Sequence, residues 1–222
     1  MNIRHHLDEA TLLSYAAGSM SQAMALVTAC HLAMCAQCRS RAQQSEAIGG
    51  ALLDNLTPAS VSDDALASVL AAIDAQDDTV QIRSVRPASS QSHAEKSDVP
   101  TPLAGYVGGS FDDIDWKRIV PGVYYFDLPC QSGGVSRLLR IAPGKAMLPH
   151  SHDGNELTLV LRGSFTDEIG RFAVGDIADL DDQVEHQPLV DSAEDCICLV
   201  ATDAPLKFTT LLGRLMQPMT GF

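Results

Sequence analysis

The chain has 222 residues with ordinary apolar content, enough for one large domain or two small ones, and its formal net charge of −13 argues against direct nucleic-acid binding through a basic face. It has no apolar run long enough to span a bilayer and no signal-peptide core near its N-terminus, so we expect a cytoplasmic protein without a membrane partner. Thiols stay reduced in that compartment, so the six cysteines are expected to be metal ligands, redox sensors or packing residues.

The first 85 residues are predicted to form a helical domain, since they are rich in Ala, Leu, Met and Gln. We expect helices near residues 8–17 and 21–41, with Gly18 and Ser19 as the break between them.

A third helix is predicted over residues 62–76, with Ser62 as its N-cap. It carries an apolar stripe at positions i, i+3, i+4 and i+7. The stripe consists of Leu66, Val69, Leu70 and Ile73.

The second predicted helix contains three soft metal ligands, His31, Cys35 and Cys38, which share one face of a continuous helix. A structural zinc site has four ligands, and the fourth would come from His6 or, alternatively, His5. The resulting His2Cys2 set would be a closed Zn²⁺ site that ties the first helix to the second. The alternative is that the two cysteines are ordinary buried thiols.

The pattern His-x3-Cys-x2-Cys, preceded by a histidine, resembles the zinc-binding anti-sigma domain over roughly residues 1–85. The resemblance implies a four-helix domain that wraps an extracytoplasmic-function sigma factor and blocks its access to core RNA polymerase. It also implies that the stripe on the third helix docks against the sigma factor, whereas packing within the domain is the alternative.

The composition changes after Gln81, and residues 84–102 are polar and rich in proline and serine. We therefore predict a flexible linker over residues 86–102. Beyond it, residues 103–222 alternate short apolar runs with turn residues, which indicates an antiparallel β-sandwich or barrel. The expected strands are residues 123–128, 135–141, 157–161, 172–180, 196–201 and 208–212.

A second group of candidate metal ligands lies in this β region. On a strand, His150 and His152 project from one face, and the turn signal Asp153-Gly154 would return Glu156 beside them, with His186 following later. Three imidazoles and a carboxylate suit Zn²⁺, Mn, Fe or Ni. Four protein ligands close a tetrahedral zinc site, whereas an octahedral iron or manganese site would keep positions open for chemistry.

The pattern Gly-x5-His-x-His-x3-Glu-x6-Gly, which begins at Gly144, resembles the first cupin motif, and His186 stands at the histidine of the second. The second motif departs from the family, because Asp181 and Asp182 replace the usual Pro and Gly and Val190 replaces an Asn. The resemblance implies a jelly-roll domain in which all four ligands hold a metal. A cupin without metal is the alternative.

The two motif sets in this order resemble the ChrR-type anti-sigma factors over nearly the whole chain. That resemblance implies a regulator, not an enzyme, which releases its sigma factor under singlet oxygen or related oxidants and needs its cupin part to respond. One alternative is a metal-dependent cupin enzyme, such as a dioxygenase, with a helical zinc module for interaction. Another is a metal-storage or metal-sensing protein. The acidic charge suits a basic, nucleic-acid-binding partner.

Cys196 and Cys198 lie on one face of a predicted strand, with Cα atoms about 6.6 Å apart. That separation is near the limit for a disulfide, so the pair is a candidate redox sensor or simply two small core residues. Cys30 and Cys130 are expected to be packing residues.

Overall fold

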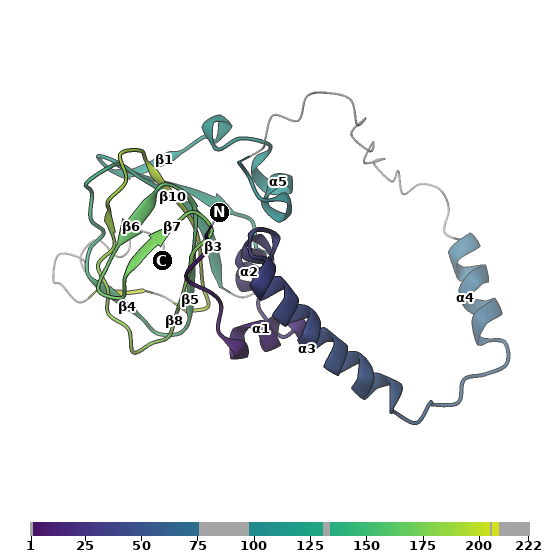
Figure 1. Ribbon diagram of the computed structural model, residues 1–222. Coiled ribbons are helices and arrows are strands. Elements are labelled where there is room, and N and C mark those ends of the chain that lie inside the picture. The colour runs from purple at the N-terminus through teal and green to yellow at the C-terminus, as the bar shows by residue number, and fades with distance from the viewer. Residues whose placement is uncertain (1, 76–97, 131–133, 205, 209–222) are drawn as a thin grey trace. The chain divides into compact units, whose positions relative to one another are not determined.

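The computed structural model describes residues 2–75, 98–130, 134–204 and 206–208 (Figure 1). The chain divides into two compact units, one made of residues 1–49 and 97–222 and the other of residues 50–96. None of the described helices is long and apolar enough to cross a membrane.

Helices α1 and α2 begin where the sequence offers a side-chain cap. The Asp8 carboxylate accepts a hydrogen bond from the Thr11 amide at the start of α1, and the Ser21 hydroxyl accepts one from Met24 at the start of α2. Gly18, with φ of +65°, separates the two helices as predicted. The helices described are α1 (Glu9–Ala16), α2 (Gln22–Met34), α3 (Ala36–Asp54), α4 (Ala65–Asp74), α5 (Thr101–Val107) and the 3-10 helix η1 (Phe111–Asp113).

The prediction of one helix over residues 21–41 is wrong, because the chain leaves helical geometry at Cys35 (φ −106°, ψ 105°) and α3 then begins. His31 therefore lies in the last turn of α2, and Cys38 lies in the first turn of α3. On a continuous helix, positions 31 and 38 would be about 10.5 Å apart along the axis. The break lets their side chains converge instead of spreading over two turns.

Helix α4 is shorter than predicted. It begins at Ala65, with Asp64 as its N-cap residue, and Ser62 only contributes its carbonyl to the preceding turn. No α4 residue is buried, and the four large apolar side chains of the stripe are all exposed. The exposed fractions are 71% for Leu66, 58% for Val69, 51% for Leu70 and 59% for Ile73.

The β region is antiparallel throughout its paired strands, as predicted. A six-stranded sheet has the order β1-β2-β3-β10-β5-β8, a three-stranded sheet has the order β7-β6-β9, and β11 pairs with β4. The strands are β1 (Lys117–Val120), β2 (Val123–Leu128), β3 (Val135–Ile141), β4 (His150–His152), β5 (Glu156–Arg162), β6 (Ser164–Thr166), β7 (Arg171–Ala173), β8 (Ile177–Leu180), β9 (Leu189–Val190), β10 (Cys196–Thr202) and β11 (Leu206–Phe208).

One strand prediction needs correction, and another lies mostly outside the described residues. Residues 172–180 form two strands, β7 and β8, because a turn that contains Gly175 at φ +91° interrupts the run. The strand expected at 208–212 is β11, which ends at Phe208 within the described chain; residues 209–212 lie outside the described residues.

The large sheet is apolar on both faces. In β10 the side chains of Cys196, Cys198 and Val200 belong to the cluster between the sheets, whereas alternate residues such as Leu199 belong to a second cluster. That second cluster also contains Val27 of α2, and Figure 1 shows α2 beside β3, β5 and β10. The N-terminal helices therefore share a hydrophobic core with the sheet.

The polar, proline-rich composition of residues 84–102 predicted a linker between helices and strands, not a shared core. Within the predicted linker, Val99 and Pro100 are buried and α5 begins at Thr101, so its last residues are part of the packed structure. The expected boundary at residue 85 falls within residues 76–97, which are outside the described residues. The division into domains at 1–85, 86–102 and 103–222 thus stays a prediction.

Candidate metal centres

The first group brings together His6, His31, Cys35 and Cys38, whose potential ligand atoms all lie within 4.8 Å of one another. The Nδ1 atom of His6 is 3.4 Å from Cys35 Sγ and 3.5 Å from Cys38 Sγ. Zinc holds sulfur at about 2.3 Å and nitrogen at about 2.0 Å, which places two tetrahedral ligands about 3.5 Å apart. The spacing of these atoms therefore fits a zinc ion.

His31 presents a lone pair to this group. Its ring is fully buried, and Nδ1 donates a hydrogen bond to the Gly175 carbonyl at 3.0 Å. Its Nε2 is buried without a hydrogen-bond partner in the described part of the chain. Burial lowers the pKa of His31 to about 4, so the imidazole is neutral. A buried acceptor without a partner costs about 1–3 kcal/mol, and a metal ion would satisfy it.

The two cysteines are buried at the α2–α3 junction, and the backbone N–H of Cys38 donates to Cys35 Sγ at 3.5 Å. Burial raises the pKa of the Cys38 thiol to about 11, so a nearby cation is needed to hold it as a thiolate. Of the two alternatives for the fourth ligand, the structure places His6 in the group. The His5 ring instead contacts the Arg171 carbonyl at 3.1 Å and packs, tilted, against the Phe172 ring, with the ring centroids 4.2 Å apart.

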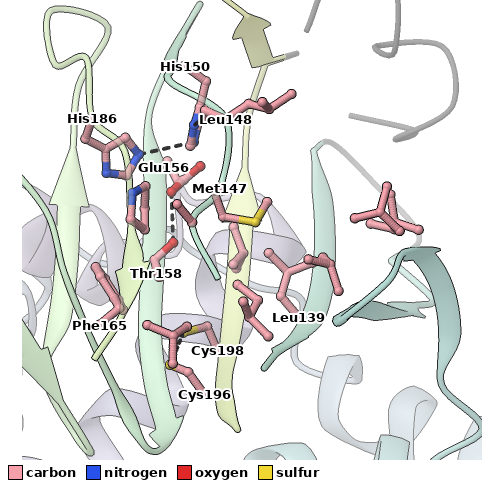
Figure 2. Close-up of a pocket in the computed structure, with 18 residues that line it drawn as sticks. Leu139, Met147, Leu148, His150, Glu156, Thr158, Phe165, His186, Cys196 and Cys198 are labelled. Carbon is pink, nitrogen blue, oxygen red and sulfur yellow. Dashed lines mark hydrogen bonds between the residues drawn. The ribbon is translucent and has the colours of Figure 1, made fainter. Parts of the chain in front are cut away.

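The second group contains His150, Glu156 and His186, which are buried and have ligand atoms within 4.8 Å of one another. Reciprocal backbone hydrogen bonds of 3.2 and 3.1 Å join His150 to His186 and set their rings side by side. Figure 2 shows these rings facing each other above Glu156, whose carboxylate accepts a hydrogen bond from Thr158 at 2.8 Å.

The ring tautomers of this group also fit a cation. His150 donates from Nδ1 to the Leu148 carbonyl at 2.8 Å, and His186 donates from Nδ1 to the Asp167 carboxylate at 3.0 Å. In its neutral form each ring then has its lone pair on Nε2, and the two Nε2 atoms are 3.2 Å apart. Two lone pairs at that distance repel unless a proton or a metal ion lies between them. The partners on Nδ1 orient such ligands in metal sites.

His152 lies in β4 with His150, but its side chain is outside what the structure describes, so its role as a ligand stays a prediction. The turn at Asp153-Gly154 is present, yet it does not form the predicted hairpin. Strand β4 pairs with β11, whereas β5 pairs with β8 and β10. The turn therefore carries the chain from one sheet to another and still places Glu156 near His150.

A cavity of about 240 Å³ extends from the second group into the space between the sheets (Figure 2). Apart from the metal-binding group and Thr158, most of its lining is aliphatic or aromatic, including Leu139, Met147 and Phe165. The cavity can hold a small apolar molecule with one polar end near the candidate metal.

Cys196 and Cys198 line the same cavity away from the histidines, with their sulfur atoms 3.6 Å apart (Figure 2). The hydrogen bond to Cys196, together with burial, raises the pKa of Cys198 well above its ordinary value. The pair is therefore close enough to react after a small movement but is poor in thiolate. Its redox role stays a prediction.

Sequence reasoning missed the residues that orient the ligands, namely Asp167, Gly175 and Thr158. Asp167 and Gly175 lie in turns 19 and 144 positions away from the histidines they contact, so motif spacing could not find them. Thr158 lies two residues after Glu156 on the same strand, and alternation alone could have placed it on the metal side.

Comparison with known proteins covers both parts of the chain. Residues 106–205 match the ChrR cupin-like domain. Over 218 residues the chain is 44% identical to anti-sigma-E factor ChrR of Cereibacter sphaeroides, and the match covers 98% of both proteins. The structure is similar to a chain in the crystal structure of Rhodobacter sphaeroides SigE in complex with the anti-sigma ChrR. The TM-score is 0.76 at 41% identity, covering 91% of this chain and 100% of that one.

Proposed function

This chain belongs to the family of the anti-sigma factor ChrR, and from that premise we propose that it binds an extracytoplasmic-function sigma factor and blocks its access to core RNA polymerase. The observation that carries the proposal is the 44% identity over 98% of a relative named as an anti-sigma factor. That name describes a regulator, so we propose regulation and not cupin catalysis. The related crystal structure, which holds SigE with ChrR, supports a sigma factor as the partner.

We assign partner binding to the apolar stripe of α4. All four stripe residues are more than half exposed, although an isolated ten-residue helix gains little stability from its own hydrogen bonds. Docking against a partner would bury these side chains and, at the same time, stabilise the helix. The net charge of −13 favours rapid association with a basic protein.

The first group is proposed to hold Zn²⁺ through His6, His31, Cys35 and Cys38. Two histidines and two cysteines are a closed tetrahedral set, which is typical of structural zinc and leaves no position for chemistry. Zinc here would fasten the segment before α1 to the α2–α3 junction, so its binding free energy becomes folding free energy.

The second group is proposed to hold Zn²⁺, with Mn, Fe or Ni as alternatives, through His150, Glu156, His186 and the untested His152. We propose that an oxidant such as singlet oxygen alters this metal shell, or the thiols of Cys196 and Cys198, and so causes release of the sigma factor. The cavity between them supports this idea because it gives a small molecule access to both.

Co-expression with each extracytoplasmic-function sigma factor of the source organism tests the function. Affinity purification should recover one sigma factor in a stable complex that contains zinc, and transcription by core polymerase with that sigma factor should fall as the chain is added. Recovery of none of these sigma factors by the folded, metal-loaded chain would contradict the proposal.

A further inference from the structure

The segment that carries His6 is fastened to the β region at one buried carboxylate. Asp176 is 2% exposed, and its two oxygens accept three backbone hydrogen bonds. Oδ1 accepts from Arg4 at 2.6 Å and from His5 at 3.0 Å, and Oδ2 accepts from Ala173 at 2.9 Å. One side chain thus joins the chain before α1 to the turn between β7 and β8.

Further contacts hold the residues on both sides of His6. The His5 carbonyl accepts from the Ile177 amide at 3.4 Å, and the Asp8 amide donates to Asp179 at 3.1 Å. The neighbouring carbonyl of Gly175 fixes the ring of His31, as described above. Two consecutive residues of the β7–β8 turn therefore position two of the four ligands in the first group.

The β-region residues that precede this turn reach the second group. Asp167, whose side chain is fully buried, accepts hydrogen bonds at Oδ1 from Ile169 and Gly170 and at Oδ2 from the ring of His186. The ten-residue stretch from Asp167 to Asp176 thus contains three residues, Asp167, Gly175 and Asp176, that contact a ligand of one of the two metal groups or the backbone beside one.

We propose that residues 167–176 are a structural link between the two metal groups and that Asp176 is a positioning residue for the first. Asp176 acts through the backbone of Arg4 and His5, which sets where the next residue, His6, presents its ring. A carboxylate can accept on both oxygens, whereas an Asn in its place would turn one acceptor into a donor that faces backbone N–H groups. The existence of this structural link does not depend on the proposed function. Only a role for the link in regulation rests on that function.

The test uses the full chain loaded with Co²⁺. Only the first group contains thiols, so the thiolate-to-cobalt charge-transfer absorption reports its occupancy without interference from the second group. Asp176→Asn should lose this absorption to a chelator at least about tenfold faster than wild type, as is usual when a partner of a metal ligand is removed.

Asp195→Asn is the matched control. Asp195 is a carboxylate of the β region too, but it is only partly buried and accepts from Arg140 at 2.6 Å, outside the segment. Its cobalt loss should stay within about twofold of wild type. Equal cobalt retention in Asp176→Asn and wild type would overturn the link, and so would equally fast loss from both variants.

A second measurement does not need the Asp176 variant to fold. Coupling between two sites is reciprocal, so removing metal from the first group by Cys38→Ser should loosen the β7–β8 turn. The Ala173 amide, which donates to Asp176, should then exchange about fivefold faster or more. The Ala142 amide, which donates to the Gly122 carbonyl in a turn outside the segment, exchanges by local opening and should stay unchanged. Unchanged exchange at Ala173 would also overturn the link.

Neither experiment contains a sigma factor, so the structural link and the proposed function can be rejected independently of each other. Fast cobalt loss from Asp176→Asn in a chain that binds no sigma factor would preserve the link and reject the proposed function. Normal cobalt retention in a variant of a chain that does bind one would reject only the link.

Discussion

Three histidines of the two groups are oriented as metal ligands by a hydrogen-bond partner on Nδ1. Gly175 holds His31, Leu148 holds His150, and Asp167 holds His186. Because the partner accepts a hydrogen bond from Nδ1–H, the proton stays on Nδ1 and the lone pair of Nε2 points toward the metal group. The chemistry of both groups therefore depends on residues that are not ligands.

Replacing Cys38 by serine should remove one metal ion per chain. The first group would keep three ligands and lose the strong thiolate bond, and the binding free energy lost is folding free energy. We expect a Tm about 6 °C lower or more, for a loss of about 2–3 kcal/mol in a chain of this size.

Cys30→Ser is the control for that variant, because Cys30 is equally buried but lies outside the group. It should lose some stability and keep its metal, so metal analysis separates the two effects. An unchanged metal content in Cys38→Ser would show that this cysteine is not a ligand.

Asp167→Ala should weaken metal binding in the second group by about 10–100-fold, because the His186 ring loses the partner that fixes its tautomer and orientation. Competition titration with Zn²⁺ would measure the effect. Asp181→Ala, at an exposed position five residues before His186 in the sequence, should bind Zn²⁺ as wild type does. Equal affinities of the two variants would contradict a role for Asp167.

The sequence indicates the ligand types because metal chemistry restricts them to a few residues at short spacings. It could not indicate that Asp167, Gly175 and Asp176 orient them, because those contacts form only after distant segments fold together. It also could not show the helix break at Cys35. Residues 31–38 contain no Gly or Pro, so local propensity favours a continuous helix, whereas convergence of the side chains requires the break.

At the scale of elements, both faces of β5 and β10 are buried, and this decides how the helices pack. The run Cys-Ile-Cys-Leu-Val-Ala in β10 is uninterrupted by polar residues, and all seven residues of the strand are buried. Such a run indicates a strand covered on both sides, and α2, apolar around most of its circumference, is a natural cover. Period-two patterning predicted the strands well, but it did not reveal which element would cover the second face.

Helix α4 differs from α2 because its apolar stripe is exposed, so a charge on the stripe should weaken partner binding without unfolding the chain. Leu70→Glu places a carboxylate in the proposed interface, where burying it without a partner is unfavourable. We expect sigma-factor affinity to fall by at least about tenfold, or about 1.4 kcal/mol. Binding to the purified sigma factor by calorimetry would measure it.

Ser68→Glu is the matched control on the opposite side of α4, where it is also exposed. It should bind nearly as wild type does, and both variants should keep the wild-type circular dichroism and Tm. If Leu70→Glu bound as tightly as Ser68→Glu, the stripe would not be the interface.

At the scale of the whole molecule, the shared core makes the helical and β regions depend on each other for stability. Removing residues 1–49 would leave the apolar face of the large sheet without α2, and Leu157, Leu159 and Leu199 are fully buried on that face in the intact chain. The flexible linker predicted over residues 86–102 would allow a fragment from residue 103 to fold alone. The shared core instead predicts that this fragment aggregates or unfolds more readily than the intact chain.

Removing the C-terminal part of the chain tests which region inhibits the sigma factor and which region senses the oxidant. A chain that ends near residue 86 keeps His6, His31, Cys35, Cys38 and the α4 stripe, so it should still inhibit its sigma factor. It loses the second metal group, the cavity and both cavity thiols, so it should no longer release the partner under oxidant. It also loses Gly175 and Asp176, and we therefore expect it to need co-expression with its partner and to lose zinc faster than the full chain.

A transcriptional reporter for the sigma factor, with and without singlet oxygen, provides the measurement. The full chain should repress in the dark and release under singlet oxygen, whereas the truncated chain should repress in both conditions. Immunoblotting must show equal amounts of the two proteins, because a destabilised fragment that is degraded would mimic release. If the truncated chain at matched abundance released its partner under oxidant as the full chain does, then sensing would reside in the zinc-binding helices, and the role assigned to the cupin region would be wrong.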